Sequence, residues 1–379
     1  MKIIHIGPES QFVSFVAESF ESAAPGVSEF FVLKGPDGHR GSYGMRNPQV
    51  HLVSSRLVAM PHILKAARAS DMIIAHSMSG VAALAFVCSR PVTKRVWSGW
   101  GFDYYGSDES SDEGLLGLAT LELALRLRSP IGRRNVMVAL KDWATIRLKR
   151  SLVHHAAART DSFSAPIPAD SEVFRKRFPE FRGGYSKISY ASVEDTFARG
   201  VEAPSCGNIL VGNSATPSNN HVELFDILKD LNVTGRRIVV PLSYGDHRYG
   251  DAVIAKGRGL FGEAFEPIVD FMPLEEYLSL VGTCGVVIMN HKRQQASGNI
   301  CAAIYHGAHV FLNETSPALE FFRSLGVFLY SIGELETQGL PSAPLPPEVV
   351  QANRDALETF WGVGRVAANV QALVSQVDQ

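Results

Sequence analysis

Short apolar runs and longer amphipathic stretches alternate along the first half of this chain, the order expected of strands followed by helices. Over residues 10–23, Phe12, Val16 and Phe20 recur at a spacing that places them on one helix face. Strands are predicted at residues 2–6, 29–33, 51–52, 71–75, 95–100, 156–162 and 187–190. Helices are predicted at residues 10–23, 57–69 and 79–89. This alternation predicts a doubly wound α/β domain on a parallel sheet.

The same alternation begins again in the second half, after a polar stretch at residues 192–207 that predicts an interdomain linker. Strands are predicted at residues 209–211, 237–241, 265–268, 285–289 and 309–312. The fold class expected is therefore α/β, with two Rossmann-like doubly wound domains facing each other across a cleft. The predicted domains span residues 1–200 and 208–345, and final helices at 346–379 are expected to pack back toward the first domain.

Composition adds little to this picture. A chain of 379 residues is long enough for two domains, and a net charge of −2 gives no indication of nucleic-acid binding. The cysteines lie far apart and are expected to be reduced in the cytoplasm: Cys88, Cys206, Cys284 and Cys301. No apolar run reaches the roughly 18–20 residues that span a bilayer, and the N-terminus lacks a signal peptide's apolar segment. The chain is expected in the cytoplasm or on the cytoplasmic face of a membrane.

The most informative stretch is residues 209–221, where three apolar residues, the turn Gly212-Asn213-Ser214 and a helical run follow one another. Gly212 allows the backbone to approach a ligand closely. The helix that follows offers unpaired N–H groups and the positive end of its dipole. At the carboxyl edge of a parallel sheet, such a turn can hold a phosphate group.

Three further loops follow predicted strands of the second half and would lie at the same sheet edge: residues 241–245, 270–275 and 290–299. Backbone donors at two helix N-termini, with Arg293 as a forked counter-charge, suit a nucleoside diphosphate. The expected donor-binding residues are Gly212, Asn213, Ser214, Ser218, Asn219, His221, Tyr244, Phe271, Met272, Glu275, Asn290, Arg293, Gln294, Gln295, Gly298 and Asn299. Since Gly-Asn-Ser turns are common, an ordinary turn is the alternative interpretation.

An aromatic stretch at residues 95–106 ends a strand of the first half and holds one carboxylate. Trp97, Trp100 and Tyr104 are expected to bind the acceptor sugar. Asp103 among these rings could have the raised pKa of a general base, although it could equally cap the next element. His76, at the end of the preceding strand, is the second candidate for the base, and a structural role is its alternative.

A basic stretch follows, with eight cations and one acid between Arg126 and Arg150. Apolar residues and Trp143 interleave with the cations, as in helices that lie on an anionic membrane surface. A solvated helix face is the alternative. Nucleic acid is disfavoured as a partner because no stacking aromatics or recognisable binding motif accompany the charges.

The chain contains no metal-ligand cluster, nucleophile elbow or Walker loop, and neither a metal nor another cofactor is expected. Three motifs resemble those of the bacterial dTDP-N-acetylfucosamine:lipid II N-acetylfucosaminyltransferases, which act on a polyprenyl diphosphate carrier in enterobacterial common antigen synthesis. They are Trp100-Gly101-Phe102-Asp103-Tyr104-Tyr105, Ile209–Ser214 with Ser218–His221, and Arg293–Gly298. Ala296 and Asn299 depart from the family pattern, which usually has Gly and Thr there.

This resemblance implies a GT-B glycosyltransferase (hexosyltransferase) with the nucleotide-sugar donor in the second lobe, the lipid-linked acceptor in the first and no metal. It also implies a peripheral enzyme on the cytoplasmic face of the inner membrane. A nucleotide-sugar 2-epimerase or hydrolase on the same fold is one alternative, and the basic stretch speaks against it. A catalytically silent nucleotide-sugar-binding protein is another, for which Asp103 and His76 would be dispensable.

Overall fold

The strands of the first unit form one parallel sheet of seven strands, in the order β3-β2-β1-β4-β5-β6-β7. The computed structural model describes residues 1–34, 49–105, 112–127, 136–199 and 207–377, with only the backbone at 112–113, 136–146 and 274. The strands are β1 Ile3–Pro8, β2 Ser28–Leu33, β3 Val50–Val53, β4 Met72–His76, β5 Lys94–Ser98, β6 Ser162–Ser164 and β7 Gly184–Tyr185. Contacts divide the chain into two compact units, of which the first comprises Met1–Gly106, Ile131–Ala191 and Val363–Gln379.

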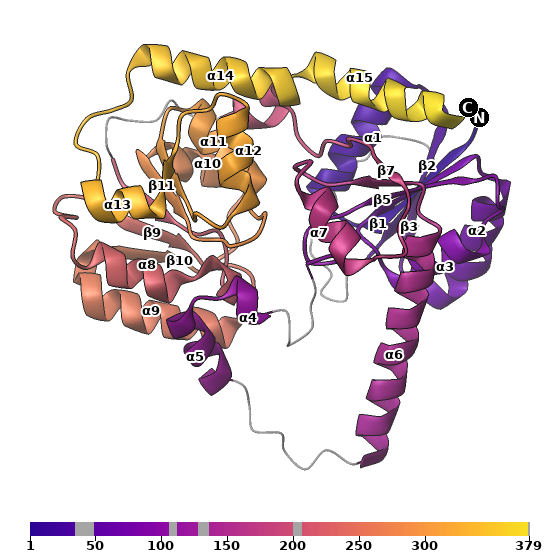
Figure 1. The fold of residues 1–379 in the computed structure, drawn as a ribbon, viewed down its shortest axis with the longest axis horizontal. Coiled ribbons are helices and arrows are strands. Elements are labelled where there is room, and N and C mark those ends of the chain that lie inside the picture. Colours follow the sequence, from indigo (N-terminus) through magenta and orange to yellow (C-terminus); the bar gives the residue numbers. More distant parts are fainter. Residues whose placement is uncertain (35–48, 106–111, 128–135, 200–206, 378–379) are drawn as a thin grey trace. The chain divides into compact units, whose positions relative to one another are not determined.

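Helices cover both faces of this sheet, as Figure 1 shows. They are α1 Gln11–Ala23, α2 Arg56–Ala69, α3 Gly80–Cys88, α6 Val136–Ala158, α7 Asp170–Arg177 and α15 Val363–Val374. Alternate residues of β1 enter opposite cores: Ile4 and Ile6 join the cluster formed with α2, α3 and α6, whereas Ile3 joins the cluster formed with α1 and α15. A strand buried on both faces needs a nearly continuous apolar run, and among residues 3–6 only His5 interrupts it, which is why β1 was recognisable in the sequence.

The second unit repeats this topology in a six-stranded parallel sheet of order β10-β9-β8-β11-β12-β13. Its strands are β8 Ile209–Val211, β9 Ile238–Pro241, β10 Phe265–Ile268, β11 Val286–Met289, β12 His309–Leu312 and β13 Tyr330–Ser331. Its main helices are α8 His221–Leu228, α9 His247–Phe261, α10 Leu274–Gly282, α11 Ser297–Tyr305, α12 Pro317–Ser324, α13 Ile332–Gln338 and α14 Pro347–Trp361. In each unit the strand order reverses beside the first strand, between β1 and β4 and between β8 and β11. Ligands bind at such a switch point.

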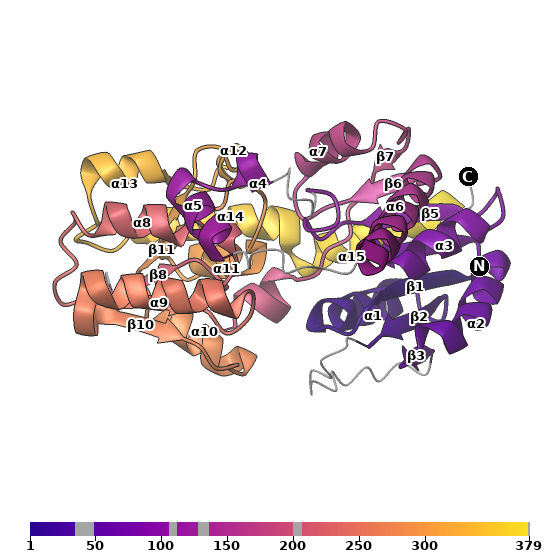
Figure 2. The same cartoon turned by 90° about the horizontal axis from the view of Figure 1, so that it is seen from below.

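One segment of the first half belongs to the second unit, which differs from the predicted domains. This inserted segment, residues 112–127, contains α4 Asp112–Leu115 and α5 Leu118–Leu127. It packs beside α8 and α9 (Figure 2), and Leu123 and Leu127 contact the core of the second unit. At its contact with α8, Glu223 accepts hydrogen bonds from the Thr120 N–H (2.9 Å) and hydroxyl (2.5 Å). The final helices divide as well: α14 belongs to the second unit, and α15 packs against α1 of the first.

Two strand predictions in the first half were wrong in position. Residues 156–158 end helix α6, and the strand that follows is only Ser162–Ser164. Residues 187–190 form no strand, since the Ile188 N–H donates to the Ser164 side chain (2.9 Å) and not to a backbone ladder. The short strand β7 precedes them.

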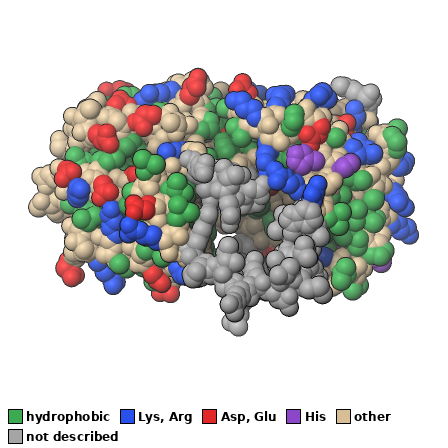
Figure 3. All heavy atoms as spheres, turned by 60° about the horizontal axis from the view of Figure 1, so that its bottom comes forward, with side chains coloured by type: hydrophobic (Ala, Val, Ile, Leu, Met, Phe, Trp, Pro, Cys, Tyr) green, Lys and Arg blue, Asp and Glu red, His purple; other side chains and the backbone are tan. Residues whose placement is uncertain are grey.

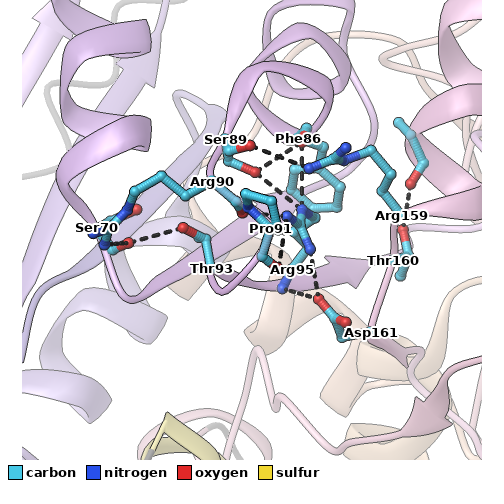
Figure 4. A network of polar contacts seen from close by, with 11 residues as sticks. Ser70, Phe86, Ser89, Arg90, Pro91, Thr93, Arg95, Arg159, Thr160 and Asp161 are labelled. Carbon is cyan, nitrogen blue, oxygen red and sulfur yellow. Dashed lines mark hydrogen bonds and ion pairs between the residues drawn. The ribbon is translucent and has the colours of Figure 1, made fainter.

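A polar network fastens the amino end of β5, on the side of the sheet away from the switch point (Figure 4). The Arg95 side chain is buried and pairs with Asp161 (Nη1–Oδ2 3.2 Å), which also accepts the Arg95 N–H (2.8 Å). Its remaining donors reach the Ser89 hydroxyl (3.0 Å), the Phe86 carbonyl (3.4 Å) and the Arg90 carbonyl (2.5 Å). One guanidinium therefore joins β5 to the end of α3 and to the start of β6.

Arg95→Met should lower the free energy of unfolding by roughly 2–4 kcal/mol, because several buried acceptors lose a charged donor. Asp161 is 45% exposed and can return to water, so its share of the loss is small. Urea denaturation measures the change. Arg68→Met is the control, because exposed Arg68 donates to the Cys88 carbonyl (3.3 Å) and should cost less than about 0.5 kcal/mol. Equal losses in both variants would contradict this role for Arg95.

Candidate functional site

The loops after β8 and β11 meet at the switch point of the second unit. Gly212 follows β8 with φ +66°, and a Cβ there would lie 2.7 Å from both Asn219 Oδ1 and His221 Nε2. Asn220 and Ala296, which precede α8 and α11, also adopt left-handed conformations, with φ 51° and 58°. Such conformations cost energy in residues with a side chain and persist where the surrounding structure holds them. The two turns are therefore built for a fixed backbone geometry.

The Asn219 side chain joins the two loops. Its Nδ2 donates to the Ser214 carbonyl (3.0 Å) and to Thr216 Oγ1 (2.8 Å). Its Oδ1 accepts from the Asn213 N–H (2.8 Å) and lies 2.8 Å from His291 Nε2, on the loop after β11. Because Oδ1 can only accept, His291 carries its proton on Nε2.

A second amide crosses the mouth of the same loops. Gln295 Nε2 donates to Asn213 Oδ1 (3.0 Å), and its Oε1 accepts from the Ser218 hydroxyl (2.8 Å). Asn213 Nδ2 in turn donates to the Tyr244 hydroxyl (2.8 Å), which brings in the loop after β9. A backbone hydrogen bond also joins this loop to the loop after β8, since the Ala215 N–H donates to the Tyr244 carbonyl (2.7 Å). Three of the four predicted loops are thus connected before any ligand binds.

Burial separates the predicted donor residues into two groups. The side chains that hold the loops are almost fully buried: Ser214, Asn219, His221, Asn290 and Gln294. Those that remain at least partly exposed are Asn213, Ser218, Tyr244, Arg293, Gln295, Gly298 and Asn299. Of these two groups, only the side chains of the second can touch a ligand directly.

The loop after β10 contributes less to this arrangement. Phe271 is 84% exposed, Glu275 is exposed and Met272 is partly buried. Among the described residues, no side-chain hydrogen bond joins these three to the other loops. Asn299 is the link to α10, since its Nδ2 donates to the Tyr277 hydroxyl (2.8 Å).

The buried histidines of the site are neutral. Burial lowers the pKa of His221 and of His291 to about 3. Positive charge at this edge therefore comes from Arg293 and Lys292, and Lys292 Nζ donates to the Leu116 carbonyl of the inserted segment (3.1 Å). Asn220 makes a second link, accepting from the Gly117 N–H (2.7 Å). The sequence prediction missed these contacts because their partners are 103 and 176 residues apart in the chain.

In the first unit, Asp103 lies at the carboxyl edge of the sheet with its carboxylate already engaged. It accepts from Trp97 Nε1 (2.8 Å), the Met78 N–H (2.9 Å) and the Trp100 N–H (2.8 Å). Burial raises its pKa, and these three hydrogen bonds act in the opposite direction. All three donors precede Asp103 in the chain, so its carboxylate fixes the turn around it and does not cap the element that follows.

The structure argues against His76 as the base. Its side chain is fully buried, and burial lowers its pKa to about 3. Nδ1 lies 2.8 Å from the Tyr190 hydroxyl and Nε2 lies 3.0 Å from His5 Nδ1. With both nitrogens partnered inside the unit, His76 cannot reach a sugar hydroxyl, and the structural alternative holds.

Two of the three predicted acceptor residues are likewise buried, which corrects that prediction. Trp97 and Tyr104 are 0% exposed and belong to the core between the sheet and α7. Trp97 donates to Asp103, and the Tyr104 hydroxyl donates to Asp170. Trp100 alone remains partly exposed.

Neither a metal site nor a membrane-spanning helix is found in the part of the chain that the structure describes. There, His, Cys, Asp and Glu side chains nowhere gather in threes in a way that could hold a metal ion. The helices there also lack the length and apolar character needed to cross a bilayer.

The comparisons with known proteins place the loops of the second-unit site within a recognised family model. Residues 193–342 match the family described as 4-alpha-L-fucosyltransferase glycosyl transferase group 56. This range contains every loop of the second-unit site. The chain is a glycosyltransferase with the GT-B fold.

Solved structures agree on the fold. HepE from Anabaena in complex with UDP-glucose superposes with a TM-score of 0.63 at 13% identity, over 99% of this chain and 100% of that one. Sucrose-phosphate synthase from Thermosynechococcus elongatus gives 0.61 at 10% identity, over 100% and 99%. The lipopolysaccharide outer core galactosyltransferase WaaB gives 0.57 at 12%, over 99% and 100%. The predicted α/β fold with two Rossmann-like domains is confirmed.

Gly212→Ala should weaken nucleotide binding by at least about tenfold, because the new Cβ displaces Asn219 or His221 and opens the turn. Isothermal titration with a nucleoside diphosphate measures this. Gly235→Ala is the matched control, since Gly235 also has a positive φ (76°) but nothing within 4 Å of its Cβ position. Both variants should lose about 1–2 kcal/mol of stability from backbone strain. Equal nucleotide affinity in the two variants would show that the turn does not contribute to binding.

Proposed function

We propose that this glycosyltransferase takes a deoxy- or amino-sugar from dTDP-N-acetylfucosamine or a related dTDP-sugar. The acceptor is a polyprenyl-diphosphate-linked glycan, as in cell-envelope polysaccharide synthesis. The observation that carries the donor half is the connected set of loops at the switch point of the second unit, inside the match to a fucosyltransferase family. The sugar and the carrier follow from the motif resemblance at Trp100–Tyr105 and Arg293–Gly298.

The donor diphosphate would be held by groups that need no metal ion. Backbone N–H groups at the start of α11, near Gly298 and Asn299, face the carboxyl edge of the sheet, where anions are favoured. Arg293 supplies a fork-shaped cation that can bind two phosphate oxygens. As the bond between sugar and phosphate breaks, charge grows on the leaving diphosphate. Donors already fixed in place stabilise that charge without reorganising.

The acceptor would be bound by the first unit. Its sugar hydroxyl is a weak nucleophile and must lose a proton as it attacks the anomeric carbon. Asp103 is the carboxylate we propose for this step, since it is partly exposed and burial raises its pKa. Hydrogen bonds from Trp97, Trp100 and Met78 hold its carboxylate in place.

Arg293→Ala should reduce sugar transfer by roughly 2–4 kcal/mol of transition-state stabilisation, or about thirty- to a thousandfold in rate. The assay supplies dTDP-, UDP- and GDP-sugars with and without a lipid-linked acceptor. Arg258→Ala, which removes an exposed cation of α9 in the same unit, is the control. Donor consumption that needs no acceptor would favour the epimerase or hydrolase alternative. Wild-type transfer and nucleotide affinity in Arg293→Ala would show that the site is misplaced.

We also propose that the basic stretch between Arg126 and Arg150 docks on anionic lipid, on the cytoplasmic face of the inner membrane. Much of the stretch, including Trp143, lies outside the described side chains. In its described part, Arg147, Lys149 and Arg150 are exposed beside Leu148, which is 74% exposed. Figure 3 views a face of the molecule whose right-hand part, over the first unit, carries Lys and Arg (blue) next to hydrophobic side chains (green).

Reversing Arg147, Lys149 and Arg150 to Glu should reduce binding to anionic vesicles by about a hundredfold or more, at about 1 kcal/mol per cation. Co-sedimentation with phosphatidylglycerol vesicles measures it. A variant with Lys65, Lys176 and Arg258 reversed changes net charge equally at scattered exposed positions and should bind more tightly than the first variant. Vesicle binding that is unchanged both by the clustered charge reversal and by high salt would contradict the proposal.

A further inference from the structure

Three aromatic rings from distant parts of the chain meet at the carboxyl edge of the first sheet. Phe12 lies in the first turn of α1, Trp100 follows β5, and Tyr190 follows β7. The ring centroids of Trp100 lie 5.8 Å from Phe12 and 5.5 Å from Tyr190, with interplanar angles of 79° and 85°. Phe12 and Tyr190 are 6.4 Å apart at 80°. All three residues keep part of their surface exposed, and Phe12 is 43% exposed.

A chain of buried hydrogen bonds holds Tyr190 in this group. The Tyr190 hydroxyl donates to Ser98 Oγ (2.7 Å) and lies 2.8 Å from His76 Nδ1. The chain continues from His76 Nε2 to His5 Nδ1 (3.0 Å) and from His5 Nε2 to Ser28 Oγ (3.2 Å). Burial lowers the pKa of both histidines, so each ring is neutral and carries a single proton. With Tyr190 donating to Ser98, every member of the chain donates to the next in one direction, starting from Ser28.

Asp103 holds Trp100 from the other side. Its carboxylate accepts the Trp100 N–H (2.8 Å) and fastens the same turn to Trp97 and Met78. The Tyr190 ring is therefore fixed by polar contacts through its hydroxyl, and the backbone of Trp100 is fixed by Asp103. Buried polar groups cost stability unless every partner is present, and a satisfied network fixes one geometry. The arrangement fixes a partly exposed aromatic surface next to the carboxylate of Asp103.

We infer that Phe12, Trp100 and Tyr190 form the subsite that binds the acceptor sugar, in place of the buried pair Trp97 and Tyr104. This inference rests on the proposed function and assigns its acceptor-binding residues. A hexose presents a C–H face that packs on aromatic rings, and hydroxyl groups at its rim that need polar partners. The three rings would pack on the C–H face, and Asp103, three residues after Trp100, would be the polar partner of a hydroxyl group. The subsite lies at the switch point between β1 and β4, where doubly wound sheets bind ligands.

Phe12→Ala tests the subsite with little risk to folding, because its ring is already 43% exposed. The Michaelis constant for a lipid-linked acceptor should rise by about fivefold or more at saturating donor, while that for the donor stays unchanged. Phe328→Ala, with a ring 48% exposed in the second unit, is the matched control and should change neither constant. An unchanged acceptor constant in Phe12→Ala would overturn the inference. The inference would also be overturned if the effect of Phe12→Ala on the acceptor constant disappeared when the polyprenyl tail is shortened, because the rings would then bind lipid.

Direct binding separates this inference from the proposed function. The chain has four tryptophans, so acceptor binding in the presence of dTDP should change the intrinsic fluorescence of the wild type. Trp100→Phe should remove most of this change but keep part of the affinity, and Trp100→Ala should lose both. If the wild type transfers no sugar, the proposed function fails, yet glycan binding that depends on Trp100 would still support the subsite. A fluorescence change that persists unaltered in Trp100→Phe would overturn it.

Discussion

The geometry of the donor site depends on the side-chain amide of Asn219. It forms hydrogen bonds with Ser214, Thr216 and the Asn213 N–H in the loop after β8. It also contacts His291 in the loop after β11. Gly212 makes this possible, because any larger residue there would occupy the space of the Asn219 oxygen. This contact takes up the Asn213 N–H, so Asn219 fixes the positions of the two loops, and the diphosphate of the proposed mechanism is left to Arg293 and the start of α11.

Both units use buried polar groups in the same way. In the second unit, neutral His291 and His221 lie beneath the loops and Arg293 is left to provide charge. In the first, His5 and His76 form part of a buried hydrogen-bond chain that includes the partly exposed Tyr190. In each case the titratable group inside is neutral and structural, and the groups that can meet substrate lie one contact further out. His76, the strand-end histidine predicted as a second candidate for the base, belongs to this structural group.

Most of the fold could be predicted from local sequence, and the reason is physical. Parallel strands buried on both faces, such as β1 and β4, leave continuous apolar runs that periodicity detects. The strand predicted at residues 156–158 was wrong because three alanines fit the end of a helix as well as the start of a strand. The unit to which residues 112–127 belong could not be predicted, because the pattern of an amphipathic helix does not show which sheet the helix covers. In the structure, contacts with Glu223 and Asn220 attach this segment to the second unit.

The residues of the two sites likewise include some that local sequence could predict and some that it could not. The turn at Gly212 and the loop at Arg293 were predictable because glycine, amide and cation follow strands that meet at one edge. The roles of Trp97, Tyr104 and His76 were not, since burial depends on partners such as Asp170 and Tyr190 that are far away in the chain. The most direct test of the donor site is isothermal titration of dTDP and dTMP into the wild-type protein with EDTA present. Fixed donors and Arg293 predict that dTDP binds about tenfold or more tightly than dTMP without metal. Equal affinities, or dTDP binding that EDTA abolishes, would contradict the account.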